Sequence, residues 1–454
     1  MSKTDEIKTL FNEYVMPTYS PELVLEKGRG SKVWDTDGKV YLDFIAGISV
    51  NNVGHCHPRV VEAIQRQAAD LMHVSNLYYT ENQARLAWRL SRLSLDGKVF
   101  FCNSGAEANE GLIKLARLWG HENEKYEIIS MTGSFHGRTL ATAAMTGQEK
   151  IQEGFEPMPE GFFPADFNDL DCVRAMITDN TAAVIVEAVQ GEGGVVPADE
   201  AFFKGIRELC DEHGLLMLCD EVQCGLGRTG SWFGYQAYGV TPDAFSLAKS
   251  LGSGYPIGAV VAGPKLADVF GPGKHASTFG GTPLACAAAL ATLDVIEDED
   301  LVSHATTVGA KFQAGLEELA SRYEHVEGVR GRGLMLGLVL DQEAAPVTEI
   351  LRDMGLLALA TAGNVIRFLP PLNVKEAELE EAIEMLDEAL EIWHDDLNAA
   401  AEAMAEAAGA VEEPAEEEAA ADAETGEEAP AEEEAGEEAP EEAAEEAEEE
   451  EKAE

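Results

Sequence analysis

The sequence predicts an α/β fold with a mostly parallel sheet and helices on both of its faces. Short apolar runs rich in β-branched residues recur between residues 98 and 263, and amphipathic stretches of helical length separate several of them. This alternation builds parallel sheets, because two parallel neighbours need a crossover that is usually a helix. Charged residues stand where some of these runs end, and that edge is where such sheets bind ligands.

The individual elements follow from length and periodicity. The runs with the length and composition of buried strands are residues 98–104, 126–131, 181–189, 214–222, 243–249 and 257–263. Helical stretches are expected at 107–120 and 200–214. A last helix is expected at 375–397, where apolar side chains at three- and four-residue steps form a stripe fit to pack on a sheet: Leu379, Ile383, Leu386, Leu390 and Trp393.

Composition indicates a large soluble globular protein. The 454 residues can bury one or two large cores, and no apolar run approaches the roughly 20 residues that span a bilayer. The first ten residues lack the apolar segment of a signal peptide, so we expect a cytoplasmic protein with no membrane partner. The seven cysteines are scattered and never spaced C-x-x-C, which argues against a disulfide framework and a structural zinc site.

The charge is strongly acidic and concentrated at one end. The chain has 84 acidic and 32 basic residues, and residues 401–454 alone hold 25 acidic residues and one lysine. Nucleic acid is therefore an unexpected partner. We expect residues 398–454 to be a disordered, solubilising tail, since a low-complexity Ala/Glu/Pro segment cannot bury enough surface to offset its ordering entropy. Transient helix and partner binding are the alternatives.

Charged residues end two of the expected strands. The apolar run 215–219 leads into Asp220 and Glu221, and a buried carboxylate there needs a cation or a hydrogen-bond donor to stay ionised. Lys249 ends the run 243–249, before a Gly-rich turn. A partly buried lysine becomes nucleophilic and suits Schiff-base chemistry with a carbonyl cofactor, whereas a lysine whose amine reaches water is the structural alternative.

Two further segments offer ligand contacts. In "NSGAEANE" a strand ends, Ser104 and Glu107 have capping-box spacing, and Gly105 allows a ligand to approach the backbone at a helix N-terminus that suits phosphate. In "GSFHGRT" Phe135 offers an aromatic face and Arg138 a fork for a carboxylate. An ordinary capped helix, a packed phenylalanine and a surface arginine are the structural alternatives for each segment taken alone.

Together these residues match the needs of one cofactor. Pyridoxal 5′-phosphate requires a lysine for its aldehyde, a carboxylate for its pyridine nitrogen, a helix N-terminus for its phosphate and an aromatic side chain against its ring. The protonated ring nitrogen would be the cation that holds Asp220 ionised.

The chain also resembles a known family, the class III aminotransferases among the fold-type I pyridoxal-phosphate-dependent transferases. The resemblance covers nearly the whole chain except the tail. It rests on "NSGAEANE", "SFHGRT", "VEAVQGEGGV", "CDEVQCGLGRTG", "SLAKSLGSGYPIGA", "HASTFGGTPLACAAA" and "NVIRFLPPL", in that order. The fold it implies is a large cofactor domain at 61–304 and a smaller α+β domain made of residues 1–60 and 305–397.

The resemblance implies a role for each candidate site residue. Lys249 and Asp220 are the catalytic pair, with Lys249 bonded to the aldehyde. Cofactor contacts come from Gly105, Ala106, Phe135, Glu221, Val222 and Gln223, and from Thr278, which is expected to reach the phosphate in a neighbouring subunit of a homodimer. Substrate contacts come from Arg138, Ser277, Glu192 and Arg367, the last two as a pair that opens when a second carboxylate must be held.

The expected reaction moves the terminal amino group of N2-acetyl-L-ornithine to 2-oxoglutarate in arginine biosynthesis, through a ping-pong mechanism. Within the family, Ile48 replaces a tyrosine that orients free ornithine, which argues against ornithine as donor but leaves 4-aminobutyrate open. Succinylornithine and succinyldiaminopimelate are further alternatives. A racemase or mutase would not need the pair Glu192 and Arg367, and a non-catalytic binding protein would not need Lys249 and Asp220.

No metal is expected. "GHCHP" places His55 and His57 on either side of Cys56, but successive side chains of an extended segment diverge and no second cluster in the sequence supplies further ligands.

Overall fold

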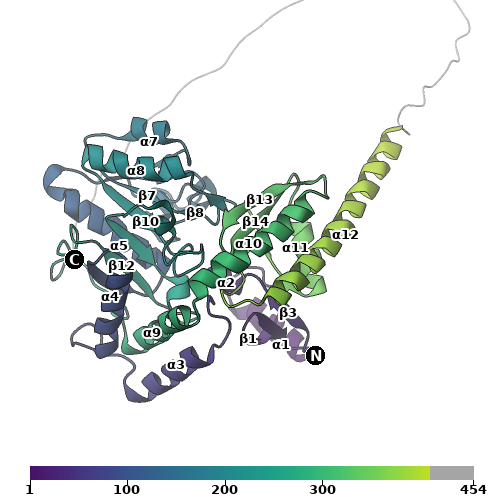
Figure 1. The fold of residues 1–454 in the computed structure, drawn as a ribbon, viewed down its shortest axis with the longest axis horizontal. Coiled ribbons are helices and arrows are strands. Elements are labelled where there is room, and N and C mark those ends of the chain that lie inside the picture. The colour runs from purple at the N-terminus through teal and green to yellow at the C-terminus, as the bar shows by residue number, and fades with distance from the viewer. Residues whose placement is uncertain (410–454) are drawn as a thin grey trace, which may run out of the picture. The chain divides into compact units, whose positions relative to one another are not determined.

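The computed structural model describes residues 1–409 (Figure 1), so most of the expected disordered tail lies outside the described residues. Residues 1–400 form one compact unit. It contains three principal sheets, and the part of the chain described has no helix with the length and apolarity that a membrane crossing requires. The division of this unit into two domains at residues 60 and 304 stays a prediction.

The largest sheet has seven strands and contains all six strands expected from the sequence. Only β12 runs antiparallel to its neighbours, so the prediction of a mostly parallel sheet is confirmed. The strand that the sequence analysis missed is the edge strand β6, which includes Pro164. In order across the sheet the strands are β4 (Lys98–Cys102), β12 (Gly258–Ala262), β11 (Ala244–Leu247), β10 (Leu216–Asp220), β7 (Thr181–Val186), β5 (Glu127–Met131) and β6 (Phe162–Ala165).

Helices cover both faces of this sheet because its central strands are apolar on both sides. Alternate residues of a strand point to opposite faces. Ile185 and Leu218 pack with α5 (Gly105–Gly120) in one core cluster, whereas Val186 and Cys219 pack with α8 (Glu200–His213) in another. The other helices near this sheet are α3 (Pro58–Asp70), α4 (Glu81–Leu93), α6 (Leu140–Met145), α7 (Leu170–Met176) and α9 (Pro283–Asp298).

Two smaller sheets bring the ends of the described chain together. The strand β15 (Leu356–Leu357) pairs in parallel with β3 (Val40–Asp43), extending the antiparallel strands β1 (Leu25–Arg29) and β2 (Lys32–Asp35). The other sheet has the order β13 (Val326–Arg332), β14 (Met335–Leu340), β17 (Val365–Phe368) and β16 (Leu359–Thr361). Figure 1 shows α10 (Leu301–Ala320) beside β13 and β14, with α11 (Ala345–Met354) near them.

The last helix, α12 (Glu376–Gly409), uses the predicted apolar stripe. Leu379, Leu386, Leu390 and Trp393 are all buried, and Ile383 packs against the same core. The helix continues past the expected boundary at 397. Alanine and glutamate are strong helix formers, and the first proline after this boundary is Pro414, so nothing in the sequence stops the helix at 397.

Candidate active site

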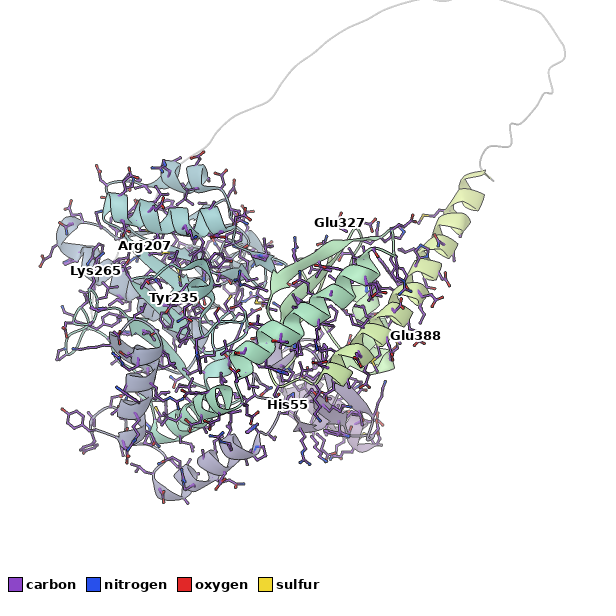
Figure 2. The ribbon with its side chains drawn as sticks, in the orientation of Figure 1. His55, Arg207, Tyr235, Lys265, Glu327 and Glu388 are labelled. Carbon is purple, nitrogen blue, oxygen red and sulfur yellow. The ribbon has the colours of Figure 1, made fainter. Side chains whose placement is uncertain are left out.

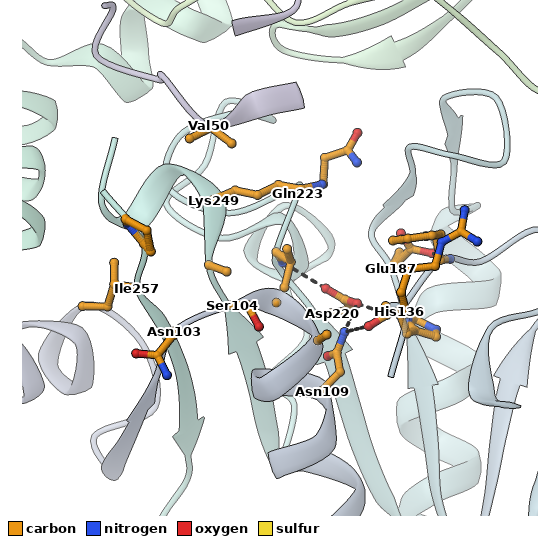
Figure 3. Close-up of a pocket in the computed structure, with 18 of the residues that line it drawn as sticks. Val50, Asn103, Ser104, Asn109, His136, Glu187, Asp220, Gln223, Lys249 and Ile257 are labelled. Carbon is orange, nitrogen blue, oxygen red and sulfur yellow. Dashed lines mark hydrogen bonds and ion pairs between the residues drawn. The ribbon is translucent and has the colours of Figure 1, made fainter. Parts of the chain in front are cut away.

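One pocket of about 440 Å³ lies at the carboxyl ends of the central strands (Figure 3). This is the expected edge of the sheet. The loops after β4, β10 and β11 reach it, together with the segment after β5. Its lining includes eight of the residues named from the sequence: Gly105, Ala106, Phe135, Arg138, Asp220, Val222, Gln223 and Lys249.

Asp220 is held by four hydrogen-bond donors. Its Oδ2 accepts from Asn109 Nδ2 at 2.7 Å and lies 2.8 Å from His136 Nδ1, contacts that Figure 3 shows as dashed lines. Its Oδ1 accepts from the Val222 amide at 3.0 Å and from Ser246 Oγ at 3.3 Å. Burial acts to raise the pKa of Asp220, but the bond and charge of His136 and the other donors outweigh it, so the pKa is lowered. Asp220 therefore stays ionised inside the pocket.

The sequence analysis did not identify Asn109 and His136 as partners of Asp220. Asn109 lies four residues after Gly105 on α5, so both residues face the pocket from one side of the helix. His136 stands between two residues that were chosen, Phe135 and Arg138. The available signals were a polar residue one turn into α5 and a histidine directly after Phe135.

Lys249 enters the pocket from the turn after β11. Its backbone φ is +41°, which is unusual for a side chain with a Cβ and is found where the surrounding structure holds the residue in place. Burial lowers the pKa of Lys249, with the nearby Arg367 acting in the same direction and the charges of Glu192 and Asp220 opposing it. Among residues 1–409 the amine has no ion-pair partner. It is therefore poised to be a neutral nucleophile.

The N-terminus of α5 forms an anion-binding cradle next to these residues. Ser104 caps the helix by accepting from the Glu107 amide at 3.2 Å, as the capping-box spacing predicted. The Glu107 carboxylate accepts at 2.6 Å from the amide of Asn103 and not from that of Ser104, so the reciprocal half of the box is absent. A Cβ at Gly105 would lie 2.8 Å from Val222 Cγ1. Only glycine fits there, and its backbone stays open to the pocket.

Glu192 and Arg367 form the predicted pair beside the pocket. Arg367 Nη1 donates to Glu192 Oε1 at 2.6 Å and to Gln223 Oε1 at 3.3 Å, and Gln223 Nε2 donates to the same Glu192 oxygen at 3.2 Å. Arg367 is fully buried, yet its Nε and Nη2 have no hydrogen-bond partner among the described residues. The guanidinium therefore has donors available for a further acceptor.

Arg138 is exposed at the pocket wall. Its guanidinium carbon lies 5.7 Å from the centre of the Phe135 ring, and it has no ion-pair partner within residues 1–409. It can therefore receive a carboxylate from solvent.

Besides Glu192 and Arg367, three further predicted residues do not line this pocket: Glu221, Ser277 and Thr278. Glu221, next in the chain after Asp220, turns away and accepts from the amides of Gly234 and Tyr235 at 2.7 and 2.9 Å, and burial raises its pKa to about 7. We leave Glu221 out of the proposed cofactor contacts. Ser277 and Thr278 line a second, more open hollow, although Ser277 Oγ accepts from the pocket residue Asn103 at 3.3 Å.

The "GHCHP" segment is not extended as expected, because the chain turns at Cys56, whose φ is +50°. Its two histidines nevertheless contact different carboxylates. His55 Nε2 lies 2.6 Å from Asp43, and His57 Nε2 lies 3.3 Å from Glu299. Ile48, the clue to substrate choice, has a positive φ of 62° within α2 (Ala46–Ser49) and is partly buried against the core; its neighbour Val50 lines the pocket.

Comparisons with known proteins agree with this geometry. A family model described as "Aminotransferase class-III" matches residues 14–390. A protein named acetylornithine aminotransferase from Methanocaldococcus jannaschii is 50% identical, covering 81% of this chain and 93% of that protein, and one of the same name from Caldanaerobacter subterraneus is 47% identical, covering 84% and 98%.

Solved structures give the same result for the fold. The ornithine aminotransferase of Toxoplasma gondii is 33% identical with a TM-score of 0.84, covering 87% of this chain and 97% of that one. The acetylornithine aminotransferase of Elizabethkingia anophelis is 35% identical with a TM-score of 0.77, covering 86% and 99%.

Proposed function

Since this chain belongs to the class III aminotransferase family, we propose that it moves the terminal amino group of N2-acetyl-L-ornithine to 2-oxoglutarate in arginine biosynthesis. The cofactor is pyridoxal 5′-phosphate. The observation that supports the reaction type best is the pairing, in one pocket, of a partly buried Lys249, whose pKa is lowered, with an Asp220 held ionised by four donors. The substrate follows from the identity shared with the acetylornithine enzymes.

The pocket residues fit the cofactor in size and chemistry. A volume of about 440 Å³ lies within the range of small-molecule sites. The amides of Gly105 and Ala106 at the start of α5 suit the phosphate, Phe135 suits a ring face, and Asp220 suits a protonated ring nitrogen. We assign Val222 and Gln223 to the same cofactor site and Lys249 to the aldehyde.

Lys249 performs the proton transfers in this proposal. When bound, the cofactor supplies an aldehyde that takes up the amino group and a ring that draws electrons from the substrate carbon. Lys249 Nζ would take the proton from the substrate carbon that bears the amine, as general base, and would deliver it to the former aldehyde carbon of the cofactor, as general acid. Its lowered pKa makes the base form easier to reach than for an exposed lysine. Asp220 keeps the ring nitrogen charged throughout.

Arginine residues select the two substrates. Arg138, exposed at the pocket wall, is proposed to hold the substrate carboxylate that acetylornithine and glutamate share, with Ser277 beside the substrate path. Glutamate has a second carboxylate, for which Arg367 offers its buried donors Nε and Nη2 once Glu192 moves aside. With acetylornithine the pair stays closed, so no bare positive charge meets the approaching amine.

We also propose a cytoplasmic homodimer in which each subunit completes the other's site. Support comes from an apolar surface next to the hollow that holds Thr278, where Leu77, Tyr79 and Phe279 expose more than half of their area. A surface of that kind marks an interaction site. The cytoplasmic location is supported by seven free cysteines, since oxidising compartments favour disulfides.

A panel of amine donors tests the proposed substrate. With 2-oxoglutarate as acceptor, acetylornithine should give the highest kcat/KM among acetylornithine, ornithine, 4-aminobutyrate and succinyldiaminopimelate. A higher value for another donor would replace the substrate but keep the reaction type. Loss of the absorbance near 420 nm on adding glutamate should show amino transfer; a racemase would leave that band, and a colourless protein would contradict the cofactor assignment.

A further inference from the structure

A second cluster of ligating side chains lies at the junction of α12 with the turn that precedes β13. It consists of Glu324, His325 and His394, whose nearest ligand atoms all lie within 4.8 Å of one another. Figure 2 labels Glu327 on β13 and Glu388 on α12, the two elements that meet here. None of the three residues lines the candidate active site. We propose that this cluster binds a divalent transition-metal ion such as Zn²⁺.

The distances within the cluster suit an ion better than direct hydrogen bonds. Glu324 Oε1 lies 3.7 Å from His325 Nε2 and 3.9 Å from His394 Nε2. Both separations are too long for a hydrogen bond, and neither Nε2 has another hydrogen-bond partner within residues 1–409. Ligand atoms about 2.0–2.2 Å from a tetrahedral zinc ion lie roughly 3.4 Å apart. Small shifts of the three side chains therefore bring them to bonding distance.

A neighbouring carboxylate sets the tautomer that metal binding needs. His325 Nδ1 lies 3.0 and 3.2 Å from the two carboxylate oxygens of Asp341, so this nitrogen bears the proton and donates it. The lone pair of His325 is then on Nε2, which faces Glu324. A carboxylate behind a ligating imidazole is the usual support of a metal-bound histidine. Asn398 Nδ2 lies 3.1 Å from His394 Nδ1, and turning this amide by 180° would place its oxygen there as the acceptor that leaves the lone pair of His394 on Nε2.

Packing holds the two imidazoles while leaving one side open. The His325 ring packs edge-on to Trp393 at 5.9 Å between centroids, and the His394 ring packs near Tyr323 at 6.5 Å. The side chains of His325 and His394 are 24% and 31% exposed, whereas that of Glu324 is 74% exposed. An ion can enter from solvent on the Glu324 side and keep water as its remaining ligand. Its effect would be to fasten α12 to the β13 sheet.

Zinc titration of the full-length, cofactor-loaded protein tests the site. The wild type should bind one more equivalent of Zn²⁺ than the double variant His325→Gln/His394→Gln, measured by calorimetry. Both proteins have the same acidic tail, the same cysteines and the same cofactor phosphate, all of which can bind zinc. The difference in zinc stoichiometry between them therefore reports on this cluster. His121→Gln, which removes an exposed histidine elsewhere, should behave as the wild type.

Two further readouts distinguish ligation from ordinary packing. Zn²⁺ should raise the Tm of the wild type and not that of the double variant, since a ligand that binds only the folded state stabilises it. Asp341→Asn should weaken zinc binding by about tenfold or more, within the range seen for partners of ligating histidines. Equal zinc stoichiometry in the wild type and a folded double variant would overturn the proposal, as would a Tm that zinc raises equally in both. If the double variant does not fold, Glu324→Gln must show the same loss of one equivalent.

Discussion

Burial and hydrogen bonding together determine the charge states of Asp220 and Lys249. Asp220 is buried and Lys249 is partly buried, but Asp220 has four donors around it whereas Lys249 has no ion-pair partner in the part of the chain described. The same desolvation therefore leaves one group charged and shifts the other toward its neutral form. A base and an anion can coexist in one pocket at neutral pH because their hydrogen-bond environments differ.

Replacing Lys249 by methionine should stabilise the cofactor-free protein while abolishing turnover. A lysine whose pKa is lowered in the folded state binds fewer protons there than when unfolded, so the wild type gains stability as pH rises toward the ordinary value of 10.5. Lys249→Met has no amine to desolvate or deprotonate on folding, so its free energy of unfolding should be higher by roughly 0.5–2 kcal/mol at neutral pH. Urea unfolding at several pH values measures this. A stability difference that does not shrink with rising pH would contradict the assignment.

Replacing Asp220 by alanine should slow both half-reactions by about 10²-fold or more, because a charge placed to stabilise the reacting state is lost. Single-turnover absorbance with glutamate and with acetylornithine measures the two halves separately. Asp268→Ala, which removes an exposed carboxylate paired with Lys98, is the matched control and should keep full activity. Unchanged rates in Asp220→Ala would mean that another group keeps the ring nitrogen protonated.

At the scale of elements, the site depends on where strands end and helices begin. Asp220 ends β10, Lys249 follows β11, and Gly105 begins α5 directly after β4. Arg367 comes from β17 in a different sheet, and its partner Glu192 lies in the loop between β8 (Val189–Gln190) and β9 (Val196–Pro197). The cofactor residues therefore share one sheet, whereas the proposed selector of the second carboxylate links two sheets.

Truncating Arg367 to alanine should impair the glutamate half-reaction at least tenfold more than the acetylornithine half-reaction. Removing one member of a buried hydrogen-bonded charge pair costs about 2–5 kcal/mol at interfaces, and only glutamate needs the second cation. Single-turnover rates with each donor separate the two effects. Arg322→Ala, at a partly exposed pair with Asp387, controls for loss of an arginine. An equal fall in both halves would identify Arg367 as a structural arginine of its sheet.

Features that depend on a short local pattern could be predicted from the sequence. Apolar runs predicted the central strands, and the Ser104 and Glu107 spacing predicted the start of α5. Sequence reasoning missed Asn109 and His136 because their contact with Asp220 joins residues 111 and 84 positions apart. It placed Glu221 among the cofactor contacts together with Asp220, although successive residues at a strand end point to opposite sides.

At the scale of the whole molecule, large apolar side chains are exposed together beside the hollow that holds Thr278. The hollow lined by Ser277 and Thr278 is bordered by exposed Leu77 and Tyr79, and Phe279 follows directly. A polar, charged chain that leaves large apolar side chains together on one surface favours association through that surface.

Mixing two inactive variants should restore activity if the proposed dimer shares its sites. Lys249→Ala removes the catalytic amine, and Thr278→Ala should weaken cofactor retention in the neighbouring site, so each pure variant should be impaired at limiting cofactor. In a mixed dimer, the subunit that keeps Lys249 receives Thr278 from the other subunit, and one of its two sites is native. Since random exchange makes half of the dimers mixed, activity should approach about a quarter of the wild-type value after unfolding and refolding the two together.

Dimer formation is checked by sedimentation, and Lys249→Ala mixed with itself is the control. Recovery no greater than the sum of the separate variants would mean that each subunit holds its cofactor alone, and Thr278 would then be a surface residue with no part in the reaction.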